Sequence, residues 1–315
     1  VTADWNIGID TLQGKIDCGI QLDQISGGID LTGSYDGQRF YSRGELDIDS
    51  LLYQKVQFTQ IHGPLWFNDQ HVLFGGWAER QTPGKVPRRV TANFYGGQLI
   101  SDCQISLGDT ARFSLNSQLS GANLATLATE MVPGGRNLSG DLSGNFQLRG
   151  SSRGAHTLQG AGTMQLRDGN VYELPLVLSL LKILSIREPD STAFNKCDVD
   201  FKISGTHILF DQFNFHGDAI SLLGKGEMDF DHNLRMVFHA IIGNDQLQLP
   251  IVRPLLGLAS QQLLLLYVYG TLEDPKTTRE ALPGVRRAVE EIQQEAEKER
   301  TMIGKTTDWF QDWIR

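Results

Sequence analysis

The chain has 315 residues, a formal net charge of −9, a hydrophobic fraction of 40% and 34 glycines. Such a length accommodates one large β domain or two smaller ones, and the hydrophobic fraction is too high for a disordered chain. The negative charge argues against nucleic-acid binding, which needs basic patches, and against simple electrostatic docking on anionic lipid headgroups. No run reaches the roughly 18 apolar residues that a membrane-spanning helix needs.

Apolar and polar residues alternate through most of the chain, and this period of two is typical of strands with one covered face. The first example is Ile16, Cys18, Ile20 and Leu22, whose intervening positions are polar or glycine, so we expect one strand there. The same alternation predicts strands over 103–107, 113–119, 199–203 and 234–238.

Turn signals separate these runs at intervals of roughly ten residues, the spacing of a hairpin meander. They are Gly27-Gly28, Asp36-Gly37, Gly75-Gly76, Gly96-Gly97, Asp168-Gly169 and Asp231-His232-Asn233. The fold class that we predict is mainly β, with a long curved antiparallel meander of some fifteen strands or more. It would form an open groove or taco-like half-barrel with two to three short covering helices and a C-terminal helix.

Four segments depart from the strand pattern. Residues 122–131 predict a short helix, and residues 174–186 predict a helix that is apolar nearly all round and hence buried. Residues 250–262 have mixed helical spacing, and residues 279–300 are a charged helix with one apolar stripe. The tip at 309–315 contains two tryptophans, which either pack on the parent domain or anchor to a partner or a membrane interface.

These features divide the chain into three parts. We expect a β-groove portion over 1–120, a second β portion with short helices over 121–277, and a helical tail over 278–315.

The three cysteines, Cys18, Cys103 and Cys197, lie far apart and form no CxxC motif, which excludes a zinc ribbon and a thioredoxin-type site. One disulfide is compatible with this spacing. The phase of Cys18 and Cys103 with neighbouring Ile and Leu favours small apolar residues on buried strand faces instead.

Metal chemistry has little support in the sequence. Residues 229–233 have the opening spacing of a calcium loop but lack its glycine and its final glutamate, so a hairpin turn explains them better. His207, His216, His232 and His239 could approach one another across strands, but strand histidines are mostly surface or pairing residues. We predict no metal and no cofactor.

Enzyme motifs are also missing: no nucleophile elbow, zinc-protease helix or phosphate-binding loop occurs. Glu45, Asp47 and Asp49 share one face of a strand and could mimic paired catalytic carboxylates, but a solvated sheet face accounts for them. We therefore expect no catalytic residues and no enzyme activity. A hydrolase or a carbohydrate-active enzyme on a β scaffold is the weakest alternative.

Several pieces, in this order, resemble the C-terminal region of AsmA-like proteins. The pieces are 160–166, 168–172, 174–176 with the apolar segment after it, the strands 201–204, 208–215 and 224–230, and the closing Gly-Thr-Leu-Glu-Asp-Pro at 270–275. Upstream, 113–119, 124–129, 138–144 and, more weakly, 29–33 also fit. The resemblance covers about half of the chain well and the first third loosely.

This resemblance implies a periplasmic protein, held in the inner membrane by a segment not present in this chain, whose curled sheet forms a long groove with an apolar floor. Proteins of this family are implicated in moving phospholipid toward the outer membrane. The expected partners are phospholipid acyl chains and, through the C-terminal helix, proteins of the inner or outer membrane. No nucleic acid is expected.

The physical pattern suggests the same ligand, because a long apolar strip left uncovered on a soluble protein usually marks a ligand or a partner. Burying an acyl chain contributes about 0.8 kcal/mol per CH₂ group. The alternating apolar positions that would line the groove are Ile20, Ile105, Phe113, Phe201, Phe215, Met236 and Phe238. The same residues would equally suit an ordinary closed core.

From the sequence we therefore predict a non-catalytic protein of the cell envelope that binds or conducts phospholipid between the inner and outer membranes. The alternative is a structural scaffold for outer-membrane protein assembly, or an adhesin-like β module.

Overall fold

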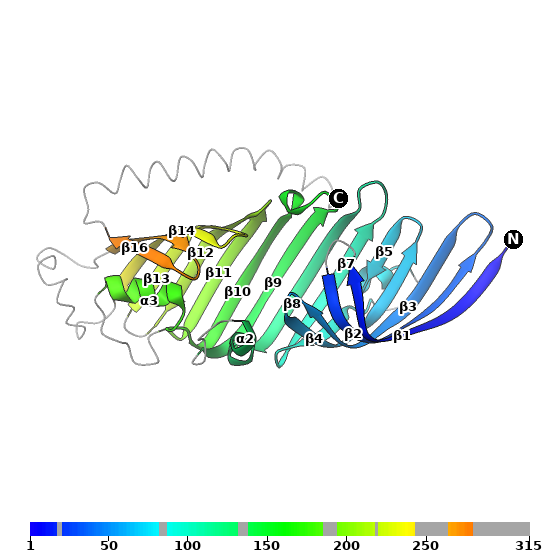
Figure 1. The fold of residues 1–315 in the computed structure, drawn as a ribbon, viewed down its shortest axis with the longest axis horizontal. Coiled ribbons are helices and arrows are strands. Elements are labelled where there is room, and N and C mark those ends of the chain that lie inside the picture. The colour runs from blue at the N-terminus through cyan, green and yellow to red at the C-terminus, as the bar shows by residue number, and fades with distance from the viewer. Residues whose placement is uncertain are drawn as a thin grey trace, which may run out of the picture.

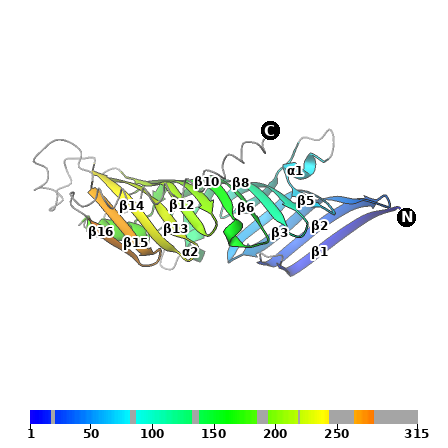
Figure 2. The same ribbon diagram turned by 90° about the horizontal axis from the view of Figure 1, so that it is seen from above.

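The computed structural model describes residues 1–17, 21–81, 87–131, 138–184, 194–217, 220–242 and 264–279. These residues form a single curved antiparallel sheet of 16 strands that stays open, with three short α-helices beside it (Figures 1 and 2). The predicted mainly β meander with an open groove is thus confirmed. The predicted helix over 250–262 and the tip at 309–315 lie outside the described residues. So does the helix predicted over 279–300, except for its first residue, Arg279, which is the last residue of strand β16.

The strands are β1 (Ala3–Asp17), β2 (Gln21–Tyr35), β3 (Phe40–Tyr53), β4 (Val56–Asn68), β5 (His71–Phe74), β6 (Val90–Phe94), β7 (Gly97–Ser106), β8 (Arg112–Asn123), β9 (Ser139–Ser151), β10 (Gln159–Asn170), β11 (Lys196–Ser204), β12 (His207–His216), β13 (Ile220–Asp229), β14 (Asn233–Ile242), β15 (Leu264–Thr271) and β16 (Pro275–Arg279). The helices are α1 (Gly76–Glu79), α2 (Leu124–Met131) and α3 (Pro175–Ile183), with a 3₁₀ turn at Ala155–Thr157.

Nearly every strand pairs with the next strand along the chain, as short hairpin connections favour. The exception is the pair β5 and β6, which follow each other along the chain but do not pair. Each of them lies between β4 and β7 and pairs with both, β5 at one end of these strands and β6 at the other. The sheet continues without a break from the first portion into the second, since β8 spans the division at residue 120. That division remains a prediction.

A line of β-bulges bends the N-terminal strands at one level. The register shifts near Gly14 in β1 and near Ser26 in β2, where Gln13 and Gln24 have positive φ, and Gln60 in β4 has positive φ as well. Because a bulge bends its strand and increases the local twist, adjacent bulges bend the whole ribbon. The β1–β2 hairpin consequently turns sharply near its tip (Figure 1).

This hairpin corrects one strand prediction. The alternating run from Ile16 to Leu22 is not one strand: β1 ends at Asp17 and β2 begins at Gln21. Ile16 and Leu22 share a face because they are cross-strand partners in the antiparallel register, not because they alternate along one strand. A period of two carries no information about where a chain reverses between two strands of the same polarity pattern.

Two predicted turns are also wrong. Gly27-Gly28 lies inside β2, where Gly27 takes a positive φ at the bulge, and Asp168-Gly169 lies inside β10, where the register shifts after Arg167. A glycine pair or an Asp-Gly pair supplies the left-handed backbone that both a turn and a bulge require. The turns at 36–37, 96–97 and 231–233 are confirmed.

The helices follow the sequence pattern closely. The segment predicted over 122–131 is α2, and the apolar segment over 174–186 contains α3, whose Leu176, Val177, Leu180 and Leu181 are buried. The short α1 was not predicted. It is held by Asp102, whose Oδ1 accepts a hydrogen bond from the Gly76 amide at 2.7 Å.

Buried apolar residues gather in two separate clusters. The C-terminal cluster packs α3 against strands β10 to β15 and includes Val177, Leu180, Phe215, Phe238 and Leu266. The N-terminal cluster is much smaller, with four buried members at the line of bulges: Ile25, Ile48, Ile61 and Ala92. The two ends of one continuous sheet are therefore covered to very different extents.

Candidate functional site

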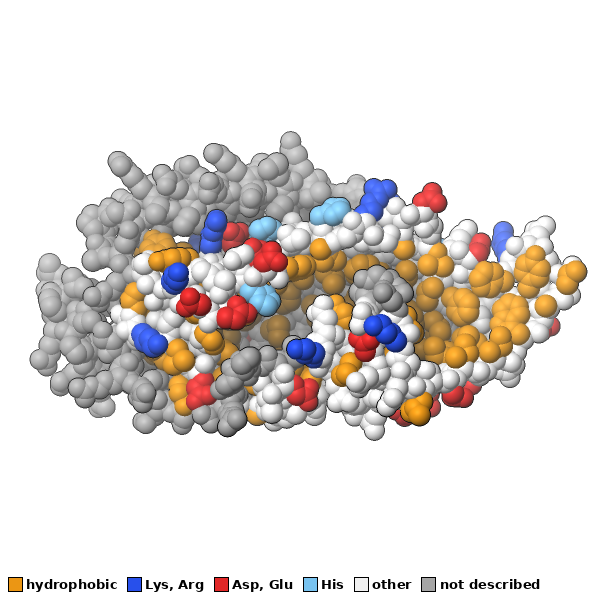
Figure 3. All heavy atoms as spheres, in the orientation of Figure 1, with side chains coloured by type: hydrophobic (Ala, Val, Ile, Leu, Met, Phe, Trp, Pro, Cys, Tyr) orange, Lys and Arg blue, Asp and Glu red, His pale blue; other side chains and the backbone are white. Residues whose placement is uncertain are grey.

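One face of the sheet carries apolar side chains from the first strand to the last, because directly paired residues share a face. The pairs follow one another across the sheet: Ile9 with Ile29, Leu65 with Phe74, Cys103 with Leu115, Met164 with Val199, and Phe238 with Leu266. We call this surface the apolar face. Hydrophobic side chains form a band along the hollowed side of the molecule, from the N-terminal end toward the middle (Figure 3).

In the N-terminal half the apolar face is open at its outermost strand, β1. Ile7 and Ile9 of β1 are 45% and 51% exposed. Farther along the sheet, Met164 of β10 is 36% exposed beside the C-terminal cluster. Trp5 lies over Gly33, and its indole Nε1 donates a hydrogen bond to the Ser42 hydroxyl at 3.4 Å. Large apolar side chains thus face solvent at β1, whereas Leu31 of β2 and Leu65 of β4 on the same face are buried.

In the C-terminal half the same face is closed by α3. Val177 and Leu180 are fully buried, and the Ser179 carbonyl accepts a hydrogen bond from the Thr277 hydroxyl of β16 at 3.3 Å. The aromatic rings of Phe213, Phe215 and Phe238 pack together beneath the helix. This part of the face is a core, and it offers no surface to a ligand in this conformation.

The sequence-predicted groove residues fall on both sides of this boundary. Ile105 and Phe113 are half-buried partners in β7 and β8, and the half-buried Phe201 lies over Gly162 of β10. The other three described residues are buried in the C-terminal cluster; they are Phe215, Met236 and Phe238. Ile20 lies outside the described residues.

Sequence reasoning missed the most exposed part of the face. Trp5, Ile7 and Ile9 alternate with Asn6, Gly8 and Asp10, which is the same period of two that identified the later strands. Their cross-strand partners Gly33, Leu31 and Ile29 repeat the pattern. The signal that could have located them was therefore present at 5–9.

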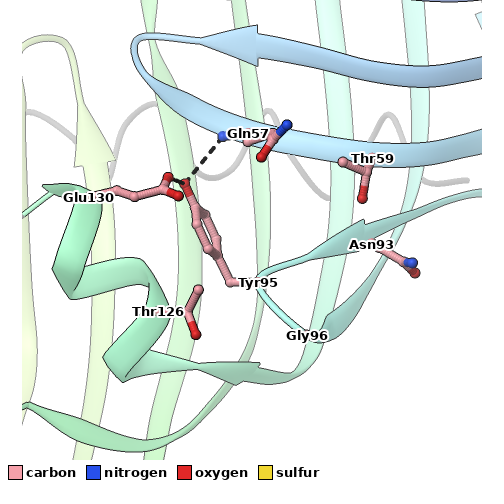
Figure 4. A pocket seen from close by; sticks show the side chains of 7 residues that line it. All are labelled: Gln57, Thr59, Asn93, Tyr95, Gly96, Thr126 and Glu130. Atoms are coloured by element: carbon pink, nitrogen blue, oxygen red, sulfur yellow. Dashed lines mark hydrogen bonds between the residues drawn. The ribbon is translucent and has the colours of Figure 1, made fainter.

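The rim beside the N-terminal cluster contains a polar cavity of about 340 Å³. Its walls come from β4, from the β6–β7 hairpin and from α2 (Figure 4). Tyr95 donates a hydrogen bond to Glu130 Oε2 at 2.5 Å and accepts one from the Gln57 amide at 3.3 Å, so it joins the three walls. The lining residues are Gln57, Thr59, Asn93, Tyr95, Gly96, Thr126 and Glu130.

The opposite face of the N-terminal strands carries ion pairs. Arg88 bridges Glu45 of β3 and the buried Glu79 of α1, and these carboxylates hold the pKa of Arg88 above its ordinary value. Asp47 pairs with His62 at 2.9 Å, and both side chains are exposed. Two of the carboxylates that could have mimicked a catalytic pair, Glu45 and Asp47, thus belong to solvent-exposed ion pairs.

The cysteines and histidines form no reactive centre in the described part of the chain. Burial raises the pKa of Cys103 to about 11 and that of Cys197 to about 12, and both thiols are free. His216 pairs with Asp198, and His232 with Glu273. Among the described residues, no group of three His, Cys, Asp or Glu is placed to hold a metal ion. Cys18 lies outside them.

Comparisons with protein-family models, with curated proteins and with solved structures found no match to this chain. In the part of the chain that the structure describes, no helix combines the length and the apolar character needed to cross a membrane.

Proposed function

We propose that the protein is a non-catalytic component of the cell envelope that binds phospholipid acyl chains on the open half of its apolar face. The observation that carries this proposal is the exposure of Ile7 and Ile9, 45% and 51%, at the outermost strand of a face that continues to the partly exposed Met164 of β10. A groove-like sheet with an uncovered apolar floor suits a long, flexible chain, whose burial is favourable at every methylene. A periplasmic location and an AsmA-like role in lipid movement complete the proposal.

The resemblance of residues 159–175 and 201–275 to AsmA-like proteins supports the same function independently of the exposed face. The absence of catalytic geometry around Glu45, Asp47 and Asp49 in the described structure fits a binding role. Variants Asp47→Asn and Asp49→Asn should therefore keep full lipid binding, whereas their loss of function would favour the hydrolase alternative.

The test compares two aspartate substitutions at equally exposed apolar positions. Ile9 is 51% exposed on the apolar face, and Tyr41 is 47% exposed on the opposite face of β3. Binding of a fluorescent phospholipid analogue should fall about tenfold in Ile9→Asp, because a charge on the floor opposes acyl contact, and should not change in Tyr41→Asp. Native mass spectrometry of the gently purified protein should detect bound phospholipid. Absence of both signals in the unmodified protein would reject the proposal.

One observation favours a second function, that of an assembly scaffold for outer-membrane proteins. β1 is 15 residues long and ends the sheet, so its outer edge pairs with no described strand and could accept a strand from a partner. The same two variants discriminate between the functions. If the protein maintains the cell envelope through strand addition alone, cells that carry Ile9→Asp should keep an envelope as intact as cells that carry Tyr41→Asp.

A further inference from the structure

The cavity beside α2 is a built polar site at the edge of an apolar surface. Its volume of about 340 Å³ is at the lower end of the range for small-molecule sites. Amide and hydroxyl side chains of Gln57, Thr59, Asn93 and Thr126 surround it, and they come from three separate elements (Figure 4). A site assembled in this way could hold a polar group of a few atoms.

A run of aromatic rings connects this cavity with the N-terminal cluster. Phe58 packs against that cluster, and its ring centroid lies 5.2 Å from that of Phe94. Phe94 in turn meets Tyr95 edge-on at 4.8 Å, and the Tyr95 hydroxyl points to Glu130. The surface therefore changes from apolar to polar over three neighbouring rings, which is the arrangement that an amphiphile requires.

The charge of the cavity restricts the polar group. Its lining contains one carboxylate, Glu130, and neither lysine nor arginine. Tyr95 engages only one oxygen of that carboxylate, and no residue in the described part of the chain binds the other. Burial and the adjacent Glu130 both raise the pKa of Tyr95, so its hydroxyl stays a donor. An anionic group would be repelled here, and a cationic group would gain a counter-ion.

We propose that this cavity holds the ammonium-bearing headgroup of an amphiphile whose chain lies along the rings of Tyr95, Phe94 and Phe58, with Glu130 as its counter-ion. This inference rests on the proposed binding of acyl chains and adds a preference among headgroups.

The experiment uses three probes with the same twelve-carbon chain, namely dodecylammonium, dodecanol and dodecanoate, below their aggregation concentrations. Each probe competes with the neutral dye Nile red on the full chain in about 150 mM salt, where the Debye length is about 8 Å and distant charges are screened. Dodecylammonium should bind about fivefold more tightly than dodecanol, as expected for one exposed ion pair, and dodecanoate should bind most weakly. Equal affinity of dodecylammonium and dodecanol would overturn the inference while leaving the proposed function intact.

Two variants and a control variant test whether the preference for dodecylammonium arises in this cavity. Glu130→Gln keeps an acceptor for Tyr95 but removes the charge, and it should abolish the preference for dodecylammonium without changing dodecanol binding. Thr126→Lys places a cation in the same cavity on an exposed helix face and should reverse the order in favour of dodecanoate. Asp69→Asn removes one exposed charge elsewhere and should change nothing.

Each remaining outcome also has a defined consequence. An undiminished preference in a folded Glu130→Gln variant, or an equal loss in Asp69→Asn, would reject Glu130 as the counter-ion. If none of the three probes displaces the dye and no phospholipid binds, the proposed function and this inference fail together. If Glu130→Gln does not fold, the order of affinities in Thr126→Lys decides the question alone.

Discussion

The two halves of the sheet share one strand pattern but use it differently. In the C-terminal half, α3 covers the alternating apolar residues, and Phe215 and Phe238 are at most 1% exposed. In the N-terminal half, the equivalent residues Ile7 and Ile9 face solvent. The alternation determines which side of a strand is apolar, and the presence of a covering element determines whether that side becomes a core or a surface. The comparison implies that stability resides mainly in one half and ligand contact in the other.

The largest expected effect tests this division directly. Phe238→Ala removes a ring from the C-terminal cluster, and the resulting cavity should lower the free energy of unfolding by about 3–5 kcal/mol. Ile9→Ala, at an open position, should change it by less than about 0.5 kcal/mol. Chemical denaturation of both variants gives the two values. Similar losses would mean that the open half is covered in solution.

Two glycines, one in each half of the sheet, test the difference in packing between the halves by adding volume instead of removing it. A Cβ on Gly224 would collide with the Phe238 ring, whereas a Cβ on Gly8 of β1 would meet nothing nearer than Asp30 Oδ1 at 3.4 Å. We expect Gly224→Ala to cost about 1–3 kcal/mol through overpacking. Gly8→Ala should be neutral or slightly stabilising, because alanine restricts the unfolded chain. Thermal unfolding of the two variants measures the difference. Because Gly8 lies on the polar side of β1 with Asn6 and Asp10, a costly Gly8→Ala would contradict solvent exposure of that side.

The bend of the N-terminal half can be tested at Gln24, which has a φ of 51° beside the bulge in β2. Gln24→Val places a β-branched residue in left-handed backbone and should cost about 1–2 kcal/mol. Gln24→Gly removes the steric cost of that conformation and should be tolerated. If valine and glycine are equally stable there, the backbone does not hold the bend in the way described. Circular dichroism during urea titration is sufficient for the measurement.

The smallest expected effect concerns the buried thiol of Cys197. Its pKa is raised to about 12 by burial, with a further contribution from Asp198, so the folded protein keeps the proton that the unfolded chain loses above its ordinary pKa of 9.0. Stability contributed by this group is present below pH 9 and is lost as the pH rises toward about 12. Alkylation at pH 8, followed by peptide mass spectrometry, should leave Cys197 unmodified until the protein unfolds. Rapid modification of the folded protein would show that α3 does not seal the cluster.

The parts of the fold that sequence reasoning predicted are those governed by local chemistry. The period of two identified the later strands, and the apolar segment before Ile186 predicted a buried helix because no polar face was available to meet water. The positions of chain reversal were harder, since Gly27-Gly28 and Asp168-Gly169 satisfy bulges and turns equally well. The cavity at Tyr95 and Glu130 could not be predicted, because these two residues are 35 positions apart. They meet through the pairing of β7 with β8, which places the residue before α2, Asn123, where its amide donates a hydrogen bond to the Tyr95 carbonyl.

The line of bulges at Gln13, Gln24 and Gln60 has a consequence for how any guest would bind. Curvature produced by backbone geometry exists before a ligand arrives, so the host does not have to bend on association. Ordering flexible groups during binding commonly costs about 0.5–1.5 kcal/mol for each immobilised side chain. A groove whose shape is already set by the backbone avoids much of the entropic cost of ordering the protein. The remaining cost falls on the flexible guest, which makes chain length and saturation of the guest natural determinants of affinity.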